Sequence, residues 1–259
     1  MLGKWRIGRR IKREVSVEVS EQDGIRSMHL GSDTVQSSMK LDDPYELVLS
    51  YTRAMMAFLL FRPEPGRVLM IGLGGGSLAK FVYRHLPEAR TTVIESEAAV
   101  VAVARQYFHV PQDEDRFIVE TADGAAWVAA HPDCCDVLMV DGYDGIEQVA
   151  GLCSADFYAN AHAALSGDGL LVVNLWSSDG RYDAYLQRIE SVFGAVVCVP
   201  AARRGNVAVI AFRQSPGQPR WDDLRATARA LQSRYGLEFL KFVEGLREMN
   251  PRSAARLLV

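Results

Sequence analysis

The stretch Val68-Leu-Met-Ile-Gly-Leu-Gly-Gly-Gly-Ser77 decides the fold of this chain. Four apolar residues lead into a glycine-rich turn, and an apolar-periodic segment over residues 78–86 follows directly. This order predicts a buried strand, a tight turn and a helix. At such a turn a ligand can lie against bare backbone, where the helix N-terminus leaves amide groups without partners.

A second apolar run ends in an acidic residue about twenty residues beyond the turn, at the usual spacing of a ribose-binding acid. Thr91-Thr-Val-Ile94 is typical of a strand, and Glu95 follows it. A carboxylate at this place can accept hydrogen bonds from the two hydroxyl groups of a ribose. The two segments together predict a site for a cofactor that carries a nucleoside.

Strand and helix patterns alternate regularly through the middle of the chain and predict an α/β fold. Such alternation implies a mostly parallel sheet with helices on both faces. Two apolar runs, 195–200 and 206–212, predict an antiparallel hairpin that closes a seven-stranded sheet. The other predicted strands are 67–71, 91–95, 116–121, 136–141 and 169–175, and the predicted helices between them are 76–86, 97–108, 124–130 and 154–165.

Smaller segments flank this α/β region. Residues 15–39 alternate apolar and polar positions and predict a small antiparallel β unit. Residues 47–61 are apolar at helical spacing, and residues 216–219 form a linker before two predicted helices, 221–235 and 237–248. We expect three parts: a basic arm and β unit (1–45), a cofactor-binding catalytic domain (46–214) and a C-terminal helical extension (215–259).

Composition narrows the class of protein. The 259 residues carry a net charge of −3, which argues against a nucleic-acid binder, although residues 4–13 form a local basic arm that we expect to be solvated. No apolar run reaches the roughly 20 residues of a membrane helix, and no secretory signal is apparent. The four cysteines and five histidines show no metal-ligand spacing. We therefore expect a cytoplasmic protein with reduced thiols and no metal site.

Four successive predicted strands end in a glycine turn or a carboxylate. In a parallel sheet ligands bind outside the carboxyl ends of the strands, so these groups are expected to share one site. For a single acid such as Asp123, capping of the next helix is an equally good interpretation. The candidate residues at the four strand ends are Gly72, Gly74, Gly75 and Gly76, then Glu95, then Asp123 and Gly124, then Asp141 and Asp144.

Two details favour an adenosyl-sulfonium compound over a nicotinamide dinucleotide. The turn has the spacing Gly-x-Gly-Gly-Gly, which differs from the Gly-x-Gly-x-x-Gly that brings a helix under a pyrophosphate. The Asp141/Asp144 pair can hold a cationic amine and take its proton as it becomes a nucleophile. Tyr143 lies between these acids and is a candidate for substrate contact, and Trp176 follows a strand and could form a wall of the substrate pocket.

From about residue 15 to residue 213 the order of these parts resembles the spermidine synthase family, the polyamine aminopropyltransferases. The resemblance implies a Rossmann-like fold of the class I methyltransferase type and a homodimer or homotetramer. It implies that decarboxylated S-adenosylmethionine is the donor and a small amine the acceptor, in polyamine biosynthesis. By the resemblance Gln36 and Glu95 hold the ribose and the methionine-derived end, and Asp123 binds the adenine. Asp141 is the implied base, with Tyr51 assisting it, and Asp144 binds a second nitrogen of the polyamine.

The chain departs from that family's pattern at several positions. Gly75 stands where the family has the aspartate that binds the free amine of the donor, Thr52 replaces a His or Gln, and Gly145 replaces a proline. Arg203 and Arg204 lie in the loop near the expected substrate site and would repel a polycation if they faced it.

The turn Gly-Leu-Gly-Gly-Gly-Ser-Leu also resembles the spermidine-synthase-like methyltransferases. Methyl transfer from S-adenosylmethionine is therefore the alternative function, because such catalysis depends mainly on orienting the nucleophile and the sulfonium. A second alternative is a family member without catalysis that serves as a binding subunit.

Overall fold

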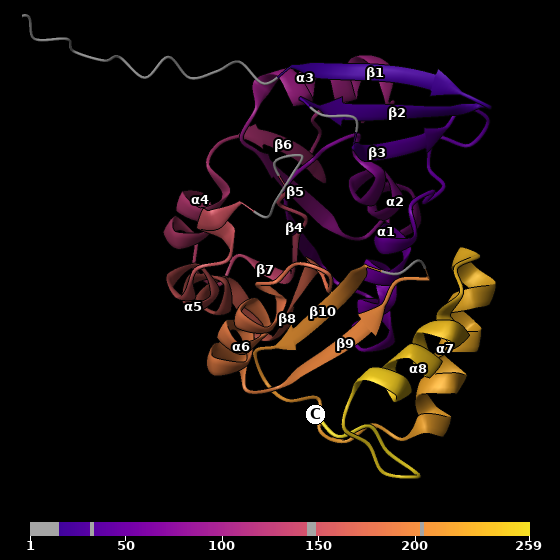
Figure 1. The fold of residues 1–259 in the computed structure, drawn as a ribbon, viewed down its shortest axis with the longest axis vertical. Helices are drawn as coiled ribbons and strands as arrows, with labels where there is room; N and C mark the ends of the chain where they lie inside the picture. Colours follow the sequence, from indigo (N-terminus) through magenta and orange to yellow (C-terminus); the bar gives the residue numbers. More distant parts are fainter. Residues whose placement is uncertain (1–15, 32–33, 144–148, 203–204) are drawn as a thin grey trace, which may run out of the picture.

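The computed structural model of the chain describes residues 16–31, 34–143, 149–202 and 205–259. A seven-stranded sheet forms the centre, and a separate three-stranded sheet lies at one end of the molecule (Figure 1). The basic arm at 4–13 and the residues Asp144, Gly145, Arg203 and Arg204, about which the sequence made predictions, lie outside the described residues. Within the described ranges no helix combines the length and apolarity needed to cross a membrane.

The large sheet has the strand order β6-β5-β4-β7-β8-β10-β9. Neighbouring strands from β6 to β8 pair in parallel, and β10 runs antiparallel to both β8 and β9, as the hairpin predicted. The predicted α/β fold with a mostly parallel sheet is confirmed. The strands are β4 (Arg67–Ile71), β5 (Arg90–Glu95), β6 (Phe117–Thr121), β7 (Cys135–Val140), β8 (Leu165–Trp176), β9 (Val196–Pro200) and β10 (Asn206–Phe212).

Both faces of this sheet are buried, each in its own hydrophobic cluster. Because successive side chains of a strand point to opposite faces, β4 sends Val68 and Met70 into one cluster and Leu69 and Ile71 into the other. The other central strands divide their side chains between the clusters in the same way. The continuous apolar runs of the sequence therefore reflect strands covered on both sides.

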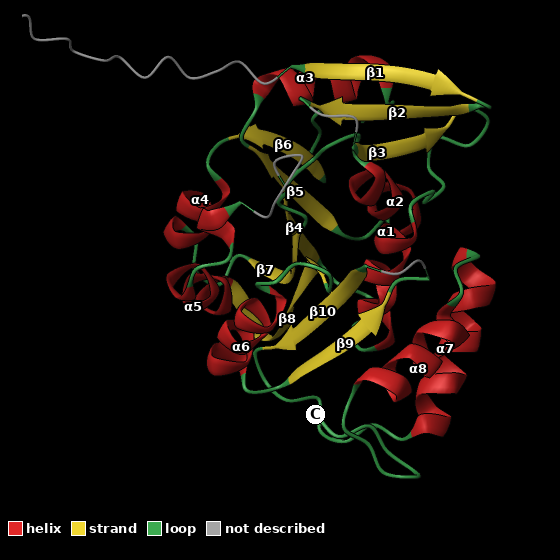
Figure 2. Ribbon diagram, viewed as in Figure 1, coloured by secondary structure: helices red, strands yellow, loops and turns green. Residues whose placement is uncertain are grey.

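Helices of different parts of the chain cover the two faces (Figure 2). One cluster contains residues of α4 (Gly124–Ala130), α5 (Ala155–Ala164) and α6 (Tyr182–Phe193). The other contains residues of α1 (Ser50–Met55), the 3-10 helix η1 (Met56–Leu60), α2 (Ser77–His85) and α3 (Ala98–Tyr107), together with the C-terminal helices.

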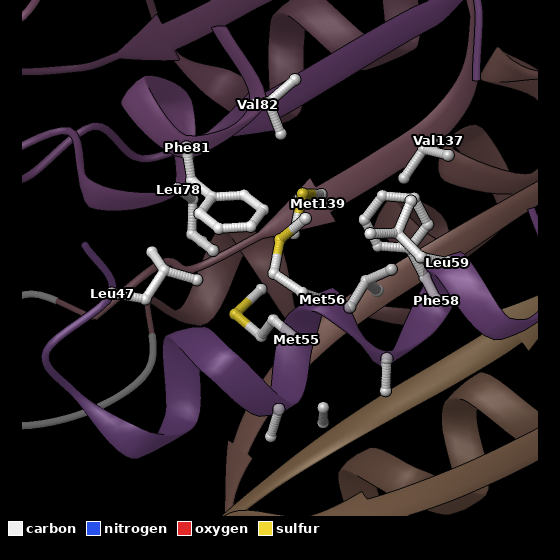
Figure 3. Packing of buried hydrophobic residues seen from close by; sticks show 14 of the residues in the cluster. Leu47, Met55, Met56, Phe58, Leu59, Leu78, Phe81, Val82, Val137 and Met139 are labelled. Atoms are coloured by element: carbon white, nitrogen blue, oxygen red, sulfur yellow. The ribbon is translucent and has the colours of Figure 1, made fainter. Parts of the chain in front are cut away.

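The run 47–61 forms a shorter α-helix than its apolar spacing predicted. The α-helix begins at Ser50, and a 3-10 helix follows at Met56. All five residues of η1 are buried. The apolar residues of this run therefore reflect a segment that is buried on every side, and not a helix with one buried face. Figure 3 shows the side chains of α1 and η1 gathered with those of α2 and with Met139 of β7.

The predicted N-terminal β unit is an antiparallel sheet of β1 (Val17–Gln22), β2 (Ile25–Leu30) and β3 (Val35–Lys40), in that order. Asp23 and Gly24 both have positive φ angles, 51° and 76°, as the two-residue hairpin turn requires. The hydroxyl of Ser37 in β3 accepts a hydrogen bond from the amide of Gly75 at 2.9 Å. This contact places the β unit against the glycine turn of the large sheet.

The C-terminal helix α8 (Phe239–Met249) packs beside β9 at one edge of the large sheet, and α7 (Trp221–Tyr235) packs against α8 (Figure 1). The Asn250 side chain accepts from the backbone N–H of Cys198 at 2.7 Å and donates to its carbonyl at 2.8 Å. Two backbone groups of the edge strand β9, which has no neighbouring strand on this side in the described chain, thereby gain hydrogen-bond partners. Trp221 and Phe239 belong to the same cluster as the sheet residues, so the helices share its core, and the division into three parts stays a prediction.

An ion pair joins the start of α8 to α1. The guanidinium of Arg53 donates to both carboxylate oxygens of Glu238, with distances of 3.0 and 2.9 Å from Nε. Nη1 of Arg53 donates to the carbonyl of Leu47 at 3.1 Å. Both ionic side chains are about one-fifth exposed. Although burial acts to raise it, the hydrogen bonds from Arg53 hold the pKa of Glu238 below its ordinary value.

We expect Glu238→Gln to lower the free energy of unfolding by about 1 kcal/mol at pH 7, because a partly exposed charge-assisted hydrogen bond is lost. A depressed carboxyl pKa contributes stability above its ordinary value of 4.5, and this is lost as the pH falls through the folded-state value. The deficit should therefore shrink below pH 4.5. Urea unfolding at pH 7 and pH 3 measures the loss of stability at each pH. The control is Glu244→Gln, which removes the carboxylate of the exposed ion pair with Arg225. An equal effect of both substitutions would contradict the expectation.

Candidate functional site

The glycine turn brings two strand ends into close contact. Gly72 has a φ angle of +93°, and a Cβ atom there would lie 2.4 Å from the carbonyl oxygen of Asp141. Gly74 also has a positive φ angle, +51°. Only glycine combines these angles with this approach of two backbones, so the turn lets the ends of β4 and β7 meet.

The strand ends open onto a cavity of about 800 Å³. Its volume lies within the range of small-molecule sites. Of the candidate residues, those that line the cavity are Gln36, Tyr51, Gly72, Gly74, Glu95, Asp123, Gly124, Asp141 and Tyr143. The reversal of strand order next to β4 opens a crevice at this place, as expected for an α/β sheet.

Glu95 is buried at the end of β5 and contacts the turn directly. Its Oε2 accepts a hydrogen bond from the amide of Leu73 at 2.9 Å, and its Oε1 accepts from the amide of Glu97 at 3.0 Å. Glu95 is 8% exposed, although it lines the cavity. The carboxylate is therefore fixed in place beside the glycine turn.

Asp123 has the capping role that the sequence offered as one interpretation. Its Oδ1 accepts from the amide of Ala126 at 2.8 Å at the N-terminus of α4. The same residue lines the cavity, so capping and ligand contact are compatible. A Cβ atom on Gly124 would lie 2.4 Å from Cγ2 of Ile71, so this glycine lets α4 approach β4.

Gly75 and Gly76 are not among the described residues that line the cavity, so their contact with a cofactor stays a prediction. A Cβ atom on Gly75 would lie 2.8 Å from Phe108 and 2.9 Å from Cβ of Ser37. A Cβ atom on Gly76 would lie 2.4 Å from Val110. These two glycines allow close packing of neighbouring segments against the turn. The sequence alone could not distinguish this packing role from contact with a cofactor.

Asp141, directly after β7, is the centre of a hydrogen-bonded group. The hydroxyl of Tyr51 donates to Oδ2 at 3.0 Å, and Nδ2 of Asn174 donates to Oδ1 at 3.0 Å. Burial raises the pKa of Asp141 above its ordinary value, and the two hydrogen bonds oppose this shift. Burial, with the nearby charge of Asp141, raises the pKa of Tyr51 well above its ordinary value, so the phenol keeps its proton.

Tyr143 and Trp176 form an aromatic wall of the cavity. Their rings stack with centroids 5.3 Å apart and an interplanar angle of 29°. Burial, together with the charge of Asp141, raises the pKa of Tyr143. The suggested place of Trp176 in the pocket wall is thus observed. An aromatic wall of this kind is suited to packing against an apolar part of a ligand.

Sequence reasoning missed Asn174 and Asn206, which both line the cavity. Asn206 donates through Nδ2 to Oδ1 of Asn174 at 2.9 Å. Asn174 is 3% exposed, within the apolar strand β8. A polar residue inside a buried strand needs a hydrogen-bond partner. The isolated asparagine in the apolar run of β8 was therefore the sequence signal that could have indicated Asn174.

The cavity is negatively charged. Its described lining includes Glu95, Glu97, Asp123 and Asp141 and contains no Lys, Arg or His. Such a lining favours cationic ligands and disfavours a carboxylate. Among the residues that the structure describes, no group of three or more His, Cys, Asp or Glu side chains could hold a metal ion.

Comparison with known proteins gives consistent relatives. The family described as "Spermine/spermidine synthase domain" matches residues 48–216. The chain is 48% identical over 244 residues to a polyamine aminopropyltransferase of Chromobacterium violaceum, covering 94% of both proteins. It is 45% identical over 239 residues to the polyamine aminopropyltransferase of Neisseria meningitidis serogroup A, covering 92% of this chain and 91% of that one.

A solved structure shares the fold. The crystal structure of a probable spermidine synthase from Corynebacterium glutamicum has a TM-score of 0.71 to this chain at 20% identity. The match covers 93% of this chain and 95% of that one. The likeness extends beyond the large sheet, because it spans nearly the whole of both chains.

Proposed function

We propose that this chain, which belongs to the spermine/spermidine synthase family, transfers an aminopropyl group from decarboxylated S-adenosylmethionine to a small amine. The observation that carries the proposal is Asp141, held by Tyr51 and Asn174 at a cavity whose described lining is acidic and has no cationic side chain. The names of the relatives at 48% and 45% identity support it.

The donor fits the nucleoside half of the cavity. In the proposal Glu95 accepts hydrogen bonds from the ribose and Asp123 contacts the adenine, while Gln36 lies beside the methionine-derived end. Gly72 and Gly74 let the ligand approach the backbone of the turn. The sulfonium is a cation, which the carboxylates of the lining stabilise.

The acceptor amine occupies the half of the cavity near Asp141 and the Tyr143/Trp176 wall. Its nitrogen attacks the aminopropyl carbon that is bonded to sulfur. A C–N bond forms as the C–S bond breaks, and the electron pair stays on sulfur, which leaves as the thioether of 5′-methylthioadenosine. The nitrogen loses one proton, which Asp141 accepts and passes to water. Its raised pKa makes Asp141 a better base than an exposed aspartate.

Asp144 binds the second nitrogen of the acceptor in this proposal, by the resemblance alone, because it lies outside the described residues. Assembly as a homodimer or homotetramer stays a prediction from the same resemblance. The cytoplasmic location stays a prediction from the composition.

Methyl transfer from S-adenosylmethionine is the second candidate, and Gly75 favours it. This position lacks the aspartate that would contact the free amine of a decarboxylated donor, and a side chain there would meet Ser37 and Phe108. The charge of the cavity favours aminopropyl transfer instead. Ordinary S-adenosylmethionine carries a carboxylate, which the acidic lining would repel.

We expect decarboxylated S-adenosylmethionine to bind at least about tenfold more tightly than S-adenosylmethionine, because one unfavourable charge contact costs about 1.4 kcal/mol or more. Calorimetry with each donor measures this. Incubation with a diamine should release 5′-methylthioadenosine, which chromatography detects. Release of S-adenosylhomocysteine with tighter binding of S-adenosylmethionine would establish methyl transfer. Binding of neither donor would favour a non-catalytic subunit.

A further inference from the structure

We propose that Asn206 is a positioning residue, which acts through Asn174 to fix the carboxylate of the base Asp141. The inference rests on the proposed aminopropyl transfer, since it assigns the orientation of that reaction's base. Asn206 is the first residue of β10, and Asn174 lies in β8. Neither residue was among the candidates that the sequence supplied.

The hairpin register puts the two amides on one face of the sheet. Asn206 is paired with Trp176, and Ala208 is paired with Asn174. Residues directly opposite one another share a face, and so do residues two apart along a strand. Asn206 and Asn174 are therefore diagonal neighbours on the face that lines the cavity. The hydrogen bond of 2.9 Å between their side chains follows from this arrangement.

The contact with Asn206 reinforces the orientation in which the donor end of the Asn174 amide meets Asp141. An asparagine side chain has an acceptor end and a donor end, whereas an ionised carboxylate only accepts. Asp141 therefore requires Nδ2 of Asn174, which lies 3.0 Å from its Oδ1, and the bond that Asn206 donates to Oδ1 of Asn174 holds the amide in that orientation. The reversed amide would put two acceptor oxygens together, so Asn206 stabilises the orientation in which Asn174 donates.

Asp141 is then held from two sides. Tyr51 donates to one carboxylate oxygen and Asn174 to the other, from α1 and β8 respectively. Tyr51 and Tyr143 are the titratable groups of the described chain that interact with Asp141, and both have raised pKa values, so both stay neutral. The hydrogen bond from Asn174 is thus one of two contacts that offset the burial of the carboxylate.

The first substitution is Asn206→Asp. An acidic side chain there accepts hydrogen bonds only, so it cannot donate to Oδ1 of Asn174 and instead competes with Asp141 for the donor end of Asn174. We expect kcat to fall about tenfold or more, the size of one lost hydrogen bond to a charged group. The acid limb of the kcat pH profile should move to higher pH, and donor affinity should stay within about twofold, because the hydrogen bonds of the nucleoside site are unchanged.

A new carboxylate also raises the pKa of Asp141 by its charge alone, so Asn206→Ala, which removes the donor without adding a charge, is the deciding variant. We expect it to lower kcat in the same direction by a smaller factor, and an unchanged kcat of Asn206→Ala would overturn the inference.

A residue that merely lines the acceptor pocket would behave differently. An added carboxylate there would attract the cationic amine and lower KM with kcat unchanged. That result, or an unmoved acid limb, would overturn the inference. Asn160→Asp, the same substitution in α5 and outside the cavity lining, is the matched control, and thermal unfolding checks that each variant is folded. If the unaltered chain releases no 5′-methylthioadenosine, the proposed function fails instead, so the two failures are distinguishable.

Discussion

Replacing Asp141 with asparagine is expected to lower kcat by about a thousandfold, within the usual range for loss of a general base. The amide has almost the shape of the carboxylate, and it can still accept from Asn174 and meet the hydroxyl of Tyr51. It cannot take a proton from the attacking amine. Steady-state release of 5′-methylthioadenosine measures kcat, and calorimetry measures donor affinity, which we expect to change by less than about threefold, because no hydrogen bond to the nucleoside is lost.

The charge change itself needs a control. Asp223→Asn removes one negative charge from the exposed start of α7, away from the cavity lining, and we expect it to leave kcat unaltered. Turnover of the Asp141 variant within threefold of the unaltered chain would show that another group, or water, accepts the proton. A parallel loss of donor affinity would show that Asp141 binds the sulfonium compound more than it acts as a base.

Lys80→Met is expected to stabilise the protein near neutral pH. Lys80 in α2 is fully buried, and its Nζ donates to the carbonyl of Phe108 at 2.7 Å. Burial lowers the pKa of Lys80 from 10.5 to about 8. The folded state therefore binds this proton less tightly than the unfolded state, which costs about 3 kcal/mol below pH 8. Allowing about 1 kcal/mol for the lost hydrogen bond, we expect the variant to be about 2 kcal/mol more stable at pH 7.

The advantage of the variant should shrink to about zero by pH 10 and reverse only above about pH 10.5. As the pH rises from 8 to 10.5 the lysine becomes neutral in the folded state first, so the cost of burying its charge disappears. The unaltered chain then regains stability relative to the variant and keeps its hydrogen bond to Phe108. Urea unfolding at pH 7 and pH 10 measures the difference. Lys241→Met, at an exposed position of α8, is the control. A difference between Lys80→Met and the unaltered chain that is constant with pH would contradict the explanation.

Much of the fold follows from local patterns. The glycine turn, the apolar runs and the acids after them predicted the seven strands from Arg67 to Phe212 and the helices α2 to α5 between them. Because the carboxyl ends of parallel strands meet at one edge, the sequence also predicted that Glu95, Asp123 and Asp141 would share a site, and all three line one cavity. Their roles toward a donor and an acceptor stay predictions.

The structure gives Gly75 a packing role in addition to the predicted cofactor contact. The sequence placed it with Gly72 and Gly74 in the cofactor site. In the fold it packs against Ser37 of β3 and against Phe108 after α3, segments far from the turn in sequence. The predicted contact of Gly75 with a cofactor stays a prediction, and the packing role could not be predicted because its neighbours come from distant segments.

The sequence by itself determined the layered α/β fold and the edge of the sheet where the site lies, because both depend on repeats and turns within short segments. How the carboxylate of Asp141 is held and which lysine is buried depend on the tertiary structure alone. Asn174 meets Asp141 across 33 positions of the chain, and Arg53 meets Glu238 across 185. Hydrogen bonds of a few ångströms between such distant residues depend on strand register and helix packing, which no local pattern specifies.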